Sequence, residues 1–146
     1  MTETPLLRDG ATTLATLKGL KAMGVSIAMG DFGTGYSSLS YLCKFPFDKI
    51  KIDRSFMEGF GKSRHDVETV IKSLVALGRE MNMRVTVEGV ETSQQVEFLC
   101  DADADQVQGF YFGKPMPATQ IGAELLDDFR SHAADAGADG KLRVVK

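Results

Sequence analysis

Four polar side chains of the types that handle phosphate groups lie at or near the ends of short apolar runs. They are Asp31, Lys51, Glu88 and Gln108. Carboxylates in such places can hold Mg²⁺ or Mn²⁺, which prefer oxygen ligands, and a nearby lysine can orient a water or offset phosphate charge. A lone acid at a strand end is often only a cap for the next helix. The four together suit metal-assisted hydrolysis of a phosphodiester.

The apolar runs that must position these side chains have the character of β-strands. They are short, rich in β-branched or aromatic residues, and bounded by turn formers. They cover residues 25–29, 49–53, 84–88 and 106–112. Asp31 follows the first run, Asp53 ends the second and Glu88 ends the third. The carboxyl ends of parallel strands share one edge of a sheet, and α/β proteins usually have their active or ligand-binding sites at this edge.

Helical patterns lie between these strands. Before the first strand, Leu14, Leu17 and Leu20 share one face. Residues 37–44 predict a short helix. The clearest apolar stripe lies in residues 66–81 and consists of Val67, Val70, Ile71, Leu74 and Leu77. Two later helices are predicted, one capped by Thr92 or Ser93 and one with Ile121, Leu125 and Phe129 on its apolar face.

Alternating strands and helices predict right-handed βαβ units and therefore an α/β fold with a parallel sheet. The chain has about four βα units, whereas a closed (β/α)8 barrel needs eight units and about 250 residues. The expected fold is a partial TIM-like barrel. Alone it would present two unpaired sheet edges, which proteins normally cover or pair, so self-association through these edges is expected.

Composition excludes several classes of protein. The 146 residues are 43% apolar and 25% charged with a net charge of −3, which fits a globular domain and not a protein that binds a nucleic-acid polymer. No apolar run approaches about 20 residues, so no membrane span is expected. Residues 1–5 lack signal-peptide features, and a cytoplasmic location is expected. Cys43 and Cys100 are expected to be buried free thiols, with a disulfide left open.

The turn after Asp31 consists of Gly33, Thr34 and Gly35, which give the backbone unusual freedom. Such a turn can approach a phosphate or move as a gate. It can equally be a tight connection between a strand and a helix, without any ligand. The glycines alone favour this second interpretation.

Four ordered stretches resemble the EAL domain family of bacterial phosphodiesterases specific for cyclic di-GMP. They are G-D-F-G-T-G-Y-S-S-L-S-Y-L from Gly30, F-P-F-D-K-I-K-I-D-R-S-F from Phe45, V-E-G-V-E-T from Val87 and Q-G-F-Y-F-G-K-P from Gln108. The resemblance would make residues 1–130 the C-terminal half of the domain. Residues 131–146, rich in Ala, Asp and Gly, are expected to form a polar tail, although residues 142–145 could pair locally. It implies a TIM-like barrel with one reversed strand, bound Mg²⁺ or Mn²⁺, and hydrolysis of cyclic di-GMP to pGpG.

The resemblance also implies roles for individual residues. Asp31 matches a metal ligand, Lys51 matches the lysine that helps to position the attacking water, and Glu88 matches a catalytic glutamate linked to metal binding. Gln108 matches a glutamine that lines the site. Glu91 matches a supporting acid near the loop.

Further residues match parts of the family that shape the substrate site. Glu3 matches an acid that anchors the Gly-Thr-Gly loop. Residues 33–38, which include Gly33, Thr34 and Gly35, match that loop, which in the family also supports dimerisation. Pro115 and Met116 lie in the stretch that closes over the nucleotide.

The chain departs from the family at several metal-site positions. The family has two adjacent aspartates where this chain has Gly30 and Asp31, and glycine has no side chain to ligate a metal. The E-A-L glutamate and a following asparagine are absent, and the first glutamate of an E-x-T-E motif would precede Met1. Asp31 and Glu88 alone cannot form a near-octahedral two-metal cage. We therefore expect that the chain as it stands does not hydrolyse cyclic di-GMP at a useful rate.

Three functions are compatible with these residues. The first is a cyclic di-GMP phosphodiesterase whose N-terminal half lies elsewhere. The second is a non-catalytic module in bacterial signalling that binds cyclic di-GMP or a partner protein. The third is a remnant that has kept no ligand. Family membership with loss of catalysis is the interpretation that the sequence favours.

Overall fold

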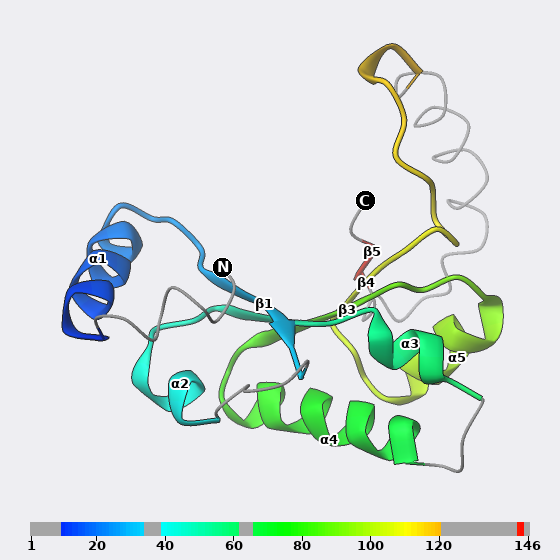
Figure 1. Cartoon of the computed structure of the whole chain (residues 1–146), viewed down its shortest axis with the longest axis horizontal. Helices are drawn as coiled ribbons and strands as arrows, with labels where there is room; N and C mark the ends of the chain where they lie inside the picture. Colours follow the sequence, from blue (N-terminus) through cyan, green and yellow to red (C-terminus); the bar gives the residue numbers. More distant parts are fainter. Residues whose placement is uncertain (1–9, 34–38, 62–65, 121–142, 145–146) are drawn as a thin grey trace.

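Five parallel strands form one sheet in the order β1-β2-β3-β4-β5, so each strand pairs with the next along the chain (Figure 1). The computed structural model describes residues 10–33, 39–61, 66–120 and 143–144. The strands are β1 (Ala28–Phe32), β2 (Lys49–Ile52), β3 (Arg84–Glu88), β4 (Gln106–Gln108) and β5 (Arg143–Val144). The helices are α1 (Gly10–Ala22), α2 (Leu39–Lys44), α3 (Ser55–Gly59), α4 (Asp66–Glu80) and α5 (Ser93–Asp101). The predicted α/β fold with a parallel sheet is confirmed.

The first strand lies three residues further along the chain than predicted. Val25 is 44% exposed, and the ladder begins where Ala28 pairs with Lys49 of β2. The pairing register then shifts within β1, and Asp31 has a φ of 55°, in the left-handed region. A bulge of this kind lets the strand continue to Phe32 and re-aims the side chains beside it. Asp31 therefore lies within the strand and not after it.

The fourth strand is shorter than predicted and ends at Gln108. Beyond it the chain turns, because the backbone N–H of Phe112 donates to the carbonyl of Gly109 at 3.1 Å. The N–H of Tyr111 donates to the carbonyl of Val90 at 3.0 Å, and the N–H of Val90 donates to the carbonyl of Gln108 at 3.2 Å. Val90, in the loop after β3, thus makes the backbone hydrogen bonds that a longer β3 would have made with a longer β4.

The last described strand, β5, lies within the stretch predicted as a polar tail. It pairs in parallel with β4, with Gln106 opposite Arg143 and Val107 opposite Val144. The helix predicted around residues 121–129 lies outside the described residues. The division of the chain at residue 130 therefore stays a prediction.

One face of the sheet is apolar and packs against helices. Its fully buried side chains include Met29, Ile50, Ile52, Val85, Val87 and Val107. Helices α3, α4 and α5 lie together on one side of the sheet (Figure 1). From α4, Ile71 and Val75 belong to the same core as Val85 and Val87 of β3.

Two residues of the predicted apolar stripes are more exposed than expected. Val70 of α4 is 41% exposed and Leu20 of α1 is 37% exposed. The buried line of α4 runs through Ile71 and Val75, and Val70 lies one position away from it, about 100° around the helix. In α1 only Leu17 is buried, so that helix rests on the core along a narrow contact.

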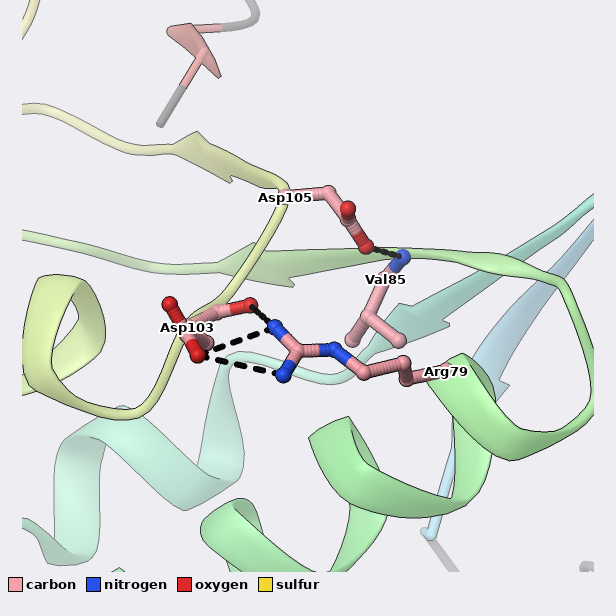
Figure 2. Close-up of polar contacts among 4 residues, drawn as sticks. All are labelled: Arg79, Val85, Asp103 and Asp105. Atoms are coloured by element: carbon pink, nitrogen blue, oxygen red, sulfur yellow. Dashed lines mark hydrogen bonds and ion pairs between the residues drawn. The ribbon is translucent and has the colours of Figure 1, made fainter. Parts of the chain in front are cut away.

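At the amino edge of the sheet, two aspartates that immediately precede strands bind the backbone of the neighbouring strand. Asp105, before β4, accepts the N–H of Val85 at 2.8 Å (Figure 2). Asp48, before β2, accepts the N–H of Ile27 at 2.8 Å and also the ammonium of Lys21 at 2.6 Å. Each carboxylate supplies the partner that a strand start would otherwise take from water.

A guanidinium makes a separate contact with Asp103, two residues before Asp105. Arg79, near the end of α4, donates to the Oδ2 atom of Asp103 at 3.1 Å and to its backbone carbonyl at 3.4 Å (Figure 2). Asp103 itself has a φ of 60°, just after α5. The contact fixes the end of α4 against the turn that leads into β4.

Replacing Asp48 by Asn should make the chain less stable near neutral pH by about 1 kcal/mol, since a charged acceptor is lost from the N–H of Ile27 and from Lys21. The hydrogen bond from Lys21, followed by the one from the N–H of Ile27, holds the pKa of Asp48 below its usual value. This contribution is therefore present above the unfolded pKa, near about 3.9, and is lost as the pH falls through the folded pKa. Urea unfolding at several pH values measures it.

The matched control for this prediction is Glu80→Gln, which removes an exposed acid at the end of α4. The difference between wild type and Asp48→Asn should shrink below about pH 4, while Glu80→Gln should follow the wild type throughout. A difference that stays constant down to strongly acidic pH would contradict the proposed role of the charge.

The two cysteines differ from the prediction. Both are free, and both are exposed rather than buried. Each lies one helical position after a buried leucine, Leu42 or Leu99, so the helix turns the sulfur away from the core. Among the described residues, no helix is long and apolar enough to cross a membrane.

Candidate cation site at the carboxyl edge of the sheet

Three carboxylates from three neighbouring strands meet at the carboxyl edge of the sheet. Asp31 comes from β1, Asp53 directly follows β2, and Glu88 ends β3. One oxygen of each lies within 4.8 Å of the others. We call these three side chains the carboxylate cluster. The register of β2 and β3, in which Ile52 lies opposite Val87, brings Asp53 and Glu88 side by side. Asp31 reaches them from the irregular part of β1, just before Phe32, which lies opposite Ile52.

Lys51 lies beside the carboxylate cluster. Its ammonium forms an ion pair with the Oε1 atom of Glu88, and the side chains of Lys51 and Glu88 are 31% and 24% exposed. Lys51 pairs with Thr86 in the register of β2 and β3, so it lies two residues before the level of Glu88 on the same face. The lysine therefore offsets part of the negative charge that three carboxylates place in one spot.

Asp53 is held in its ionised form by the start of α3. The backbone N–H of Ser55 donates to its Oδ1 atom at 2.9 Å. The hydroxyl of Ser55, and then this N–H, hold the pKa of Asp53 below its usual value, although partial burial works in the opposite direction. The group is therefore a carboxylate near neutral pH, as a cation ligand must be.

The sheet face that carries the cluster is polar along β2, β3 and β4. Paired residues in a parallel sheet share a face, and the rows on this face are Lys49 with Arg84, Lys51 with Thr86 and Gln106, and Glu88 with Gln108. Thr86 and Gln106 are buried, and the hydroxyl of Thr86 donates to the Oε1 atom of Gln106 at 3.0 Å. Burial of Lys49, together with the nearby Arg84, holds the pKa of its ammonium below its usual value.

Some of the predicted site residues lie close together in the structure, and others do not. Asp31 and Glu88 belong to the carboxylate cluster, Lys51 pairs with Glu88, and Gln108 lies opposite Glu88 in the register of β3 and β4. The roles expected of these four residues stay predictions. Glu91 lies in the loop after β3 and is exposed, with its backbone N–H donating to Gln95 at 2.7 Å.

The remaining predicted residues do not belong to the carboxylate cluster. Gly33 ends the described part of the loop after β1. Pro115 is exposed and Met116 is half-buried in the segment that leaves the sheet after β4 (Figure 1). Glu3, Thr34 and Gly35 lie outside the described residues.

Asp53 is the site residue that the sequence interpretation left unassigned. Its signal was present in the sequence, because it is an acid that directly follows an apolar strand, as Glu88 does at the end of another. What the sequence did not show was that the Asp53 and Asp31 side chains reach the same point. Asp31 lies where the pairing register of β1 shifts, and a pattern along the chain does not predict such a shift.

The donor set of the carboxylate cluster fits a hard divalent cation. Mg²⁺ binds oxygen ligands at about 2.1 Å, so two ligands on opposite sides of one ion lie about 4.2 Å apart. Oxygens that all lie within 4.8 Å of one another are close to that span. The cluster therefore fits one Mg²⁺ or Mn²⁺. Among the described residues no other group of three acids, histidines or cysteines comes together in this way.

The fold and the site together define a segment of a parallel α/β barrel with a cluster of three carboxylates at the carboxyl edge of its strands. The chain belongs to the EAL domain family, whose family model matches residues 1–115. The predicted partial TIM-like barrel is confirmed, since the chain superposes on part of solved EAL domains.

Individual relatives agree with this assignment. The chain is 44% identical over 125 residues to the bifunctional diguanylate cyclase/cyclic di-GMP phosphodiesterase MucR of Pseudomonas aeruginosa, over 86% of this chain and 18% of that protein. It is similar to the solved PaMucR phosphodiesterase in complex with c-di-GMP, with a TM-score of 0.75 and 45% identity, over 83% of this chain and 49% of that one. It is also similar to Klebsiella pneumoniae BlrP1 in a manganese/cy-diGMP complex, with a TM-score of 0.68 and 32% identity, over 78% of this chain and 29% of that one.

The chain matches only part of these proteins. It spans about half of the solved PaMucR chain, and between 15% and 18% of the length of the first three curated relatives. What those whole proteins bind or hydrolyse is therefore a basis for proposals about this chain.

Proposed function

We propose that the chain carries one part of the active site of a cyclic di-GMP phosphodiesterase. Asp31, Asp53 and Glu88 would hold a Mg²⁺ or Mn²⁺, and Lys51 would position the attacking water. The observation that supports this most is the meeting of the three carboxylates beside a lysine at the carboxyl edge of the sheet. The manganese/cy-diGMP complex of BlrP1, a relative by structure, agrees with the choice of cation and ligand.

Each side chain has a role that its chemistry allows. A divalent cation supplies stabilisation for the negative charge of a phosphodiester undergoing attack. Lys51 is within contact of Glu88 and has further N–H donors for a phosphate oxygen or a water. Gln108, opposite Glu88, offers an amide donor and acceptor to the nucleotide. Glu88 is a ligand and also orients Lys51.

The residues outside the cluster would shape the nucleotide site. In this proposal Gly33, Thr34 and Gly35 form a loop at its mouth that is anchored by Glu3, and Glu91 supports it. Pro115 and Met116 would lie over the bound nucleotide. These roles follow the family resemblance.

We also propose that the 146 residues on their own do not hydrolyse cyclic di-GMP at a useful rate. Gly30, beside Asp31, offers no ligand where the family has a second aspartate. The carboxylate cluster has enough oxygen ligands for one cation, whereas a two-metal site needs carboxylates for both.

The test is a turnover assay with cyclic di-GMP and Mg²⁺ or Mn²⁺, with products separated by chromatography. We expect no pGpG from this chain above the level of a Glu88→Ala control. In a full-length EAL barrel that carries this segment, Gly30→Asp should raise turnover. Formation of pGpG by the isolated chain, above the control, would contradict the proposed lack of activity. No gain from Gly30→Asp would show that Gly30 is not the disabling residue.

Gly30 also favours a second candidate function, a non-catalytic module that binds cyclic di-GMP. Loss of one ligand from a metal site removes turnover more readily than it removes nucleotide contacts. In this proposal Lys51, beside Glu88, and Gln108, opposite Glu88, make such contacts. Calorimetric titration with cyclic di-GMP tests this function. Binding without turnover would support it, and absence of binding would leave a protein partner as the ligand of the module.

The proposal extends to the oligomeric state and the cellular location of the protein. We propose that two copies associate through sheet edges or through residues 33–38, and a monodisperse monomer by light scattering would contradict this. We place the protein in the cytoplasm, because two free, exposed thiols suit a reducing compartment.

A further inference from the structure

The short helix α3 contacts the loops that follow β1 and β3, and it begins two residues after Asp53. Each member of the carboxylate cluster therefore lies within two residues of a position that contacts α3 or Arg54, or of the start of α3 itself. Three separate contacts make this connection, and each involves different atoms.

The first contact joins α3 to the loop after β1. The ring of Phe56 lies directly against Gly33, where a Cβ atom would come within 2.5 Å of ring atom Cε2 and 2.6 Å of Cζ. Gly33 is two residues after Asp31. Phe56 therefore limits how far the Asp31 end of β1 can move toward α3.

The second contact joins the start of α3 to the loop after β3. Gly89, next to Glu88, has a φ of 77° and packs against Arg54, where a Cβ atom would lie 2.5 Å from Cβ of Arg54 and 3.0 Å from its Cα. Arg54 follows Asp53 directly. The backbone beside Asp53 and the backbone beside Glu88 are thus in van der Waals contact.

The third contact is made by the side chain of Gln95, which is 8% exposed. Its Oε1 atom accepts the backbone N–H of Glu91 at 2.7 Å and of Thr92 at 3.1 Å. Its Nε2 atom donates to the carbonyl of Met57 in α3 at 3.2 Å. The first half of this arrangement is a capping box for α5, completed by Thr92. The bond to Met57 is no part of a helix cap, and it ties the loop after Glu88 to α3.

We propose that Gln95 is a positioning residue for the carboxylate cluster, acting through α3, and that Phe56 completes the same support from the side of β1. The inference rests on the proposed function, since it takes the cluster as the cation site. Groups that orient metal ligands commonly matter for affinity nearly as much as the ligands do. Here that support comes from a buried amide that bridges two loops.

Gln95→Glu separates the two roles of this side chain, which are to cap α5 and to bind the carbonyl of Met57. A glutamate keeps the capping box, because its carboxylate accepts from Glu91 and Thr92, but in its ionised form it has no hydrogen to donate to Met57. The variant is therefore measured above about pH 7. Its added negative charge would by itself favour a cation, so weaker binding cannot be an effect of charge. The matched control is Thr92→Ala, which removes the hydroxyl half of the capping box and leaves the bond to Met57 in place.

Two readouts on the 146-residue chain test the inference. The first is the Mn²⁺ dissociation constant from electron paramagnetic resonance of the free ion. The second is the amide exchange rate of Ser55 in metal-free protein by NMR, because this N–H donates to Asp53. For Gln95→Glu we expect Mn²⁺ binding about tenfold weaker and clearly faster Ser55 exchange, and for Thr92→Ala neither change, only a lower melting temperature.

The outcomes separate this inference from the proposed function. If the wild type binds no Mn²⁺ and Gln95→Glu still speeds Ser55 exchange, the cation site is wrong and the support of Asp53 by Gln95 stands. If Ser55 exchange is unchanged in Gln95→Glu, or changes equally in Thr92→Ala, the positioning role is overturned. Should Gln95→Glu fail to fold, Phe56→Leu takes its place and must weaken Mn²⁺ binding in a folded protein, or the inference fails.

Discussion

Gly109→Ala is expected to destabilise the chain by about 3 kcal/mol or more, because the added methyl group has no space to occupy. A Cβ atom at Gly109 would lie 2.0 Å from the carbonyl oxygen of Val90 and 2.3 Å from its nitrogen. The backbone of Val90 cannot move away without losing its hydrogen bonds to Gln108 and Tyr111, at 3.2 Å and 3.0 Å. Urea unfolding monitored by circular dichroism measures the loss.

Gly19→Ala is the matched control for this substitution. Gly19 lies in the interior of α1, and a Cβ atom there would meet nothing within 4 Å. Alanine at that position should leave stability unchanged or raise it by up to about 1 kcal/mol. A Gly109→Ala protein as stable as wild type would show that the crossing of Val90 and Gly109 is not tight in solution.

Glu88→Gln is expected to weaken Mn²⁺ binding by about 100-fold, since it replaces a charged ligand of the carboxylate cluster by a neutral one of the same shape. The same change breaks the ion pair with Lys51. Titration of Mn²⁺ by electron paramagnetic resonance measures the affinity. Glu97→Gln, an exposed acid on α5, is the control with the same change of charge.

Lys51→Met should act in the opposite direction. Removing the ammonium beside Glu88 takes a positive charge away from the cation, so Mn²⁺ should bind about fivefold more tightly at low salt.

For the prediction on Glu88→Gln, an equal loss of affinity in Glu88→Gln and Glu97→Gln would mean that the effect comes from net charge. The carboxylate cluster would then not be the binding site.

The sequence alone predicts those strands whose bounds follow from an alternation of polar and apolar residues within the strand itself. The runs 49–53 and 84–88 became β2 and β3 almost residue for residue, because their apolar and polar positions alternate with respect to one buried face. The first strand was misplaced because its bounds depend on where β2 offers partners, and Val25 has none in the ladder. The shortened β4 has the same kind of cause, since Val90 occupies the place of a pairing partner.

The candidate site was predicted in the same uneven way. Asp31, Lys51 and Glu88 were identified from their positions at strand ends, and the parallel register brought them together. The sequence assigns no role to Asp53, because its proximity to Asp31 joins two strands whose pairing register is irregular. The second role of Gln95 depends on the placement of α3, which a pattern along the chain does not encode.

The two edges of the sheet use their acids differently, and this has a consequence for how such a chain can change over generations. Asp48 and Asp105 bind backbone groups of the neighbouring strands at the amino edge, whereas Asp31, Asp53 and Glu88 gather at the opposite edge. Substitutions at one edge therefore alter chemistry while the other edge keeps the strands in register. On the proposed function, a loss of turnover through Gly30 would leave the scaffold intact, so a lineage of such chains could pass from degrading a messenger to sensing it.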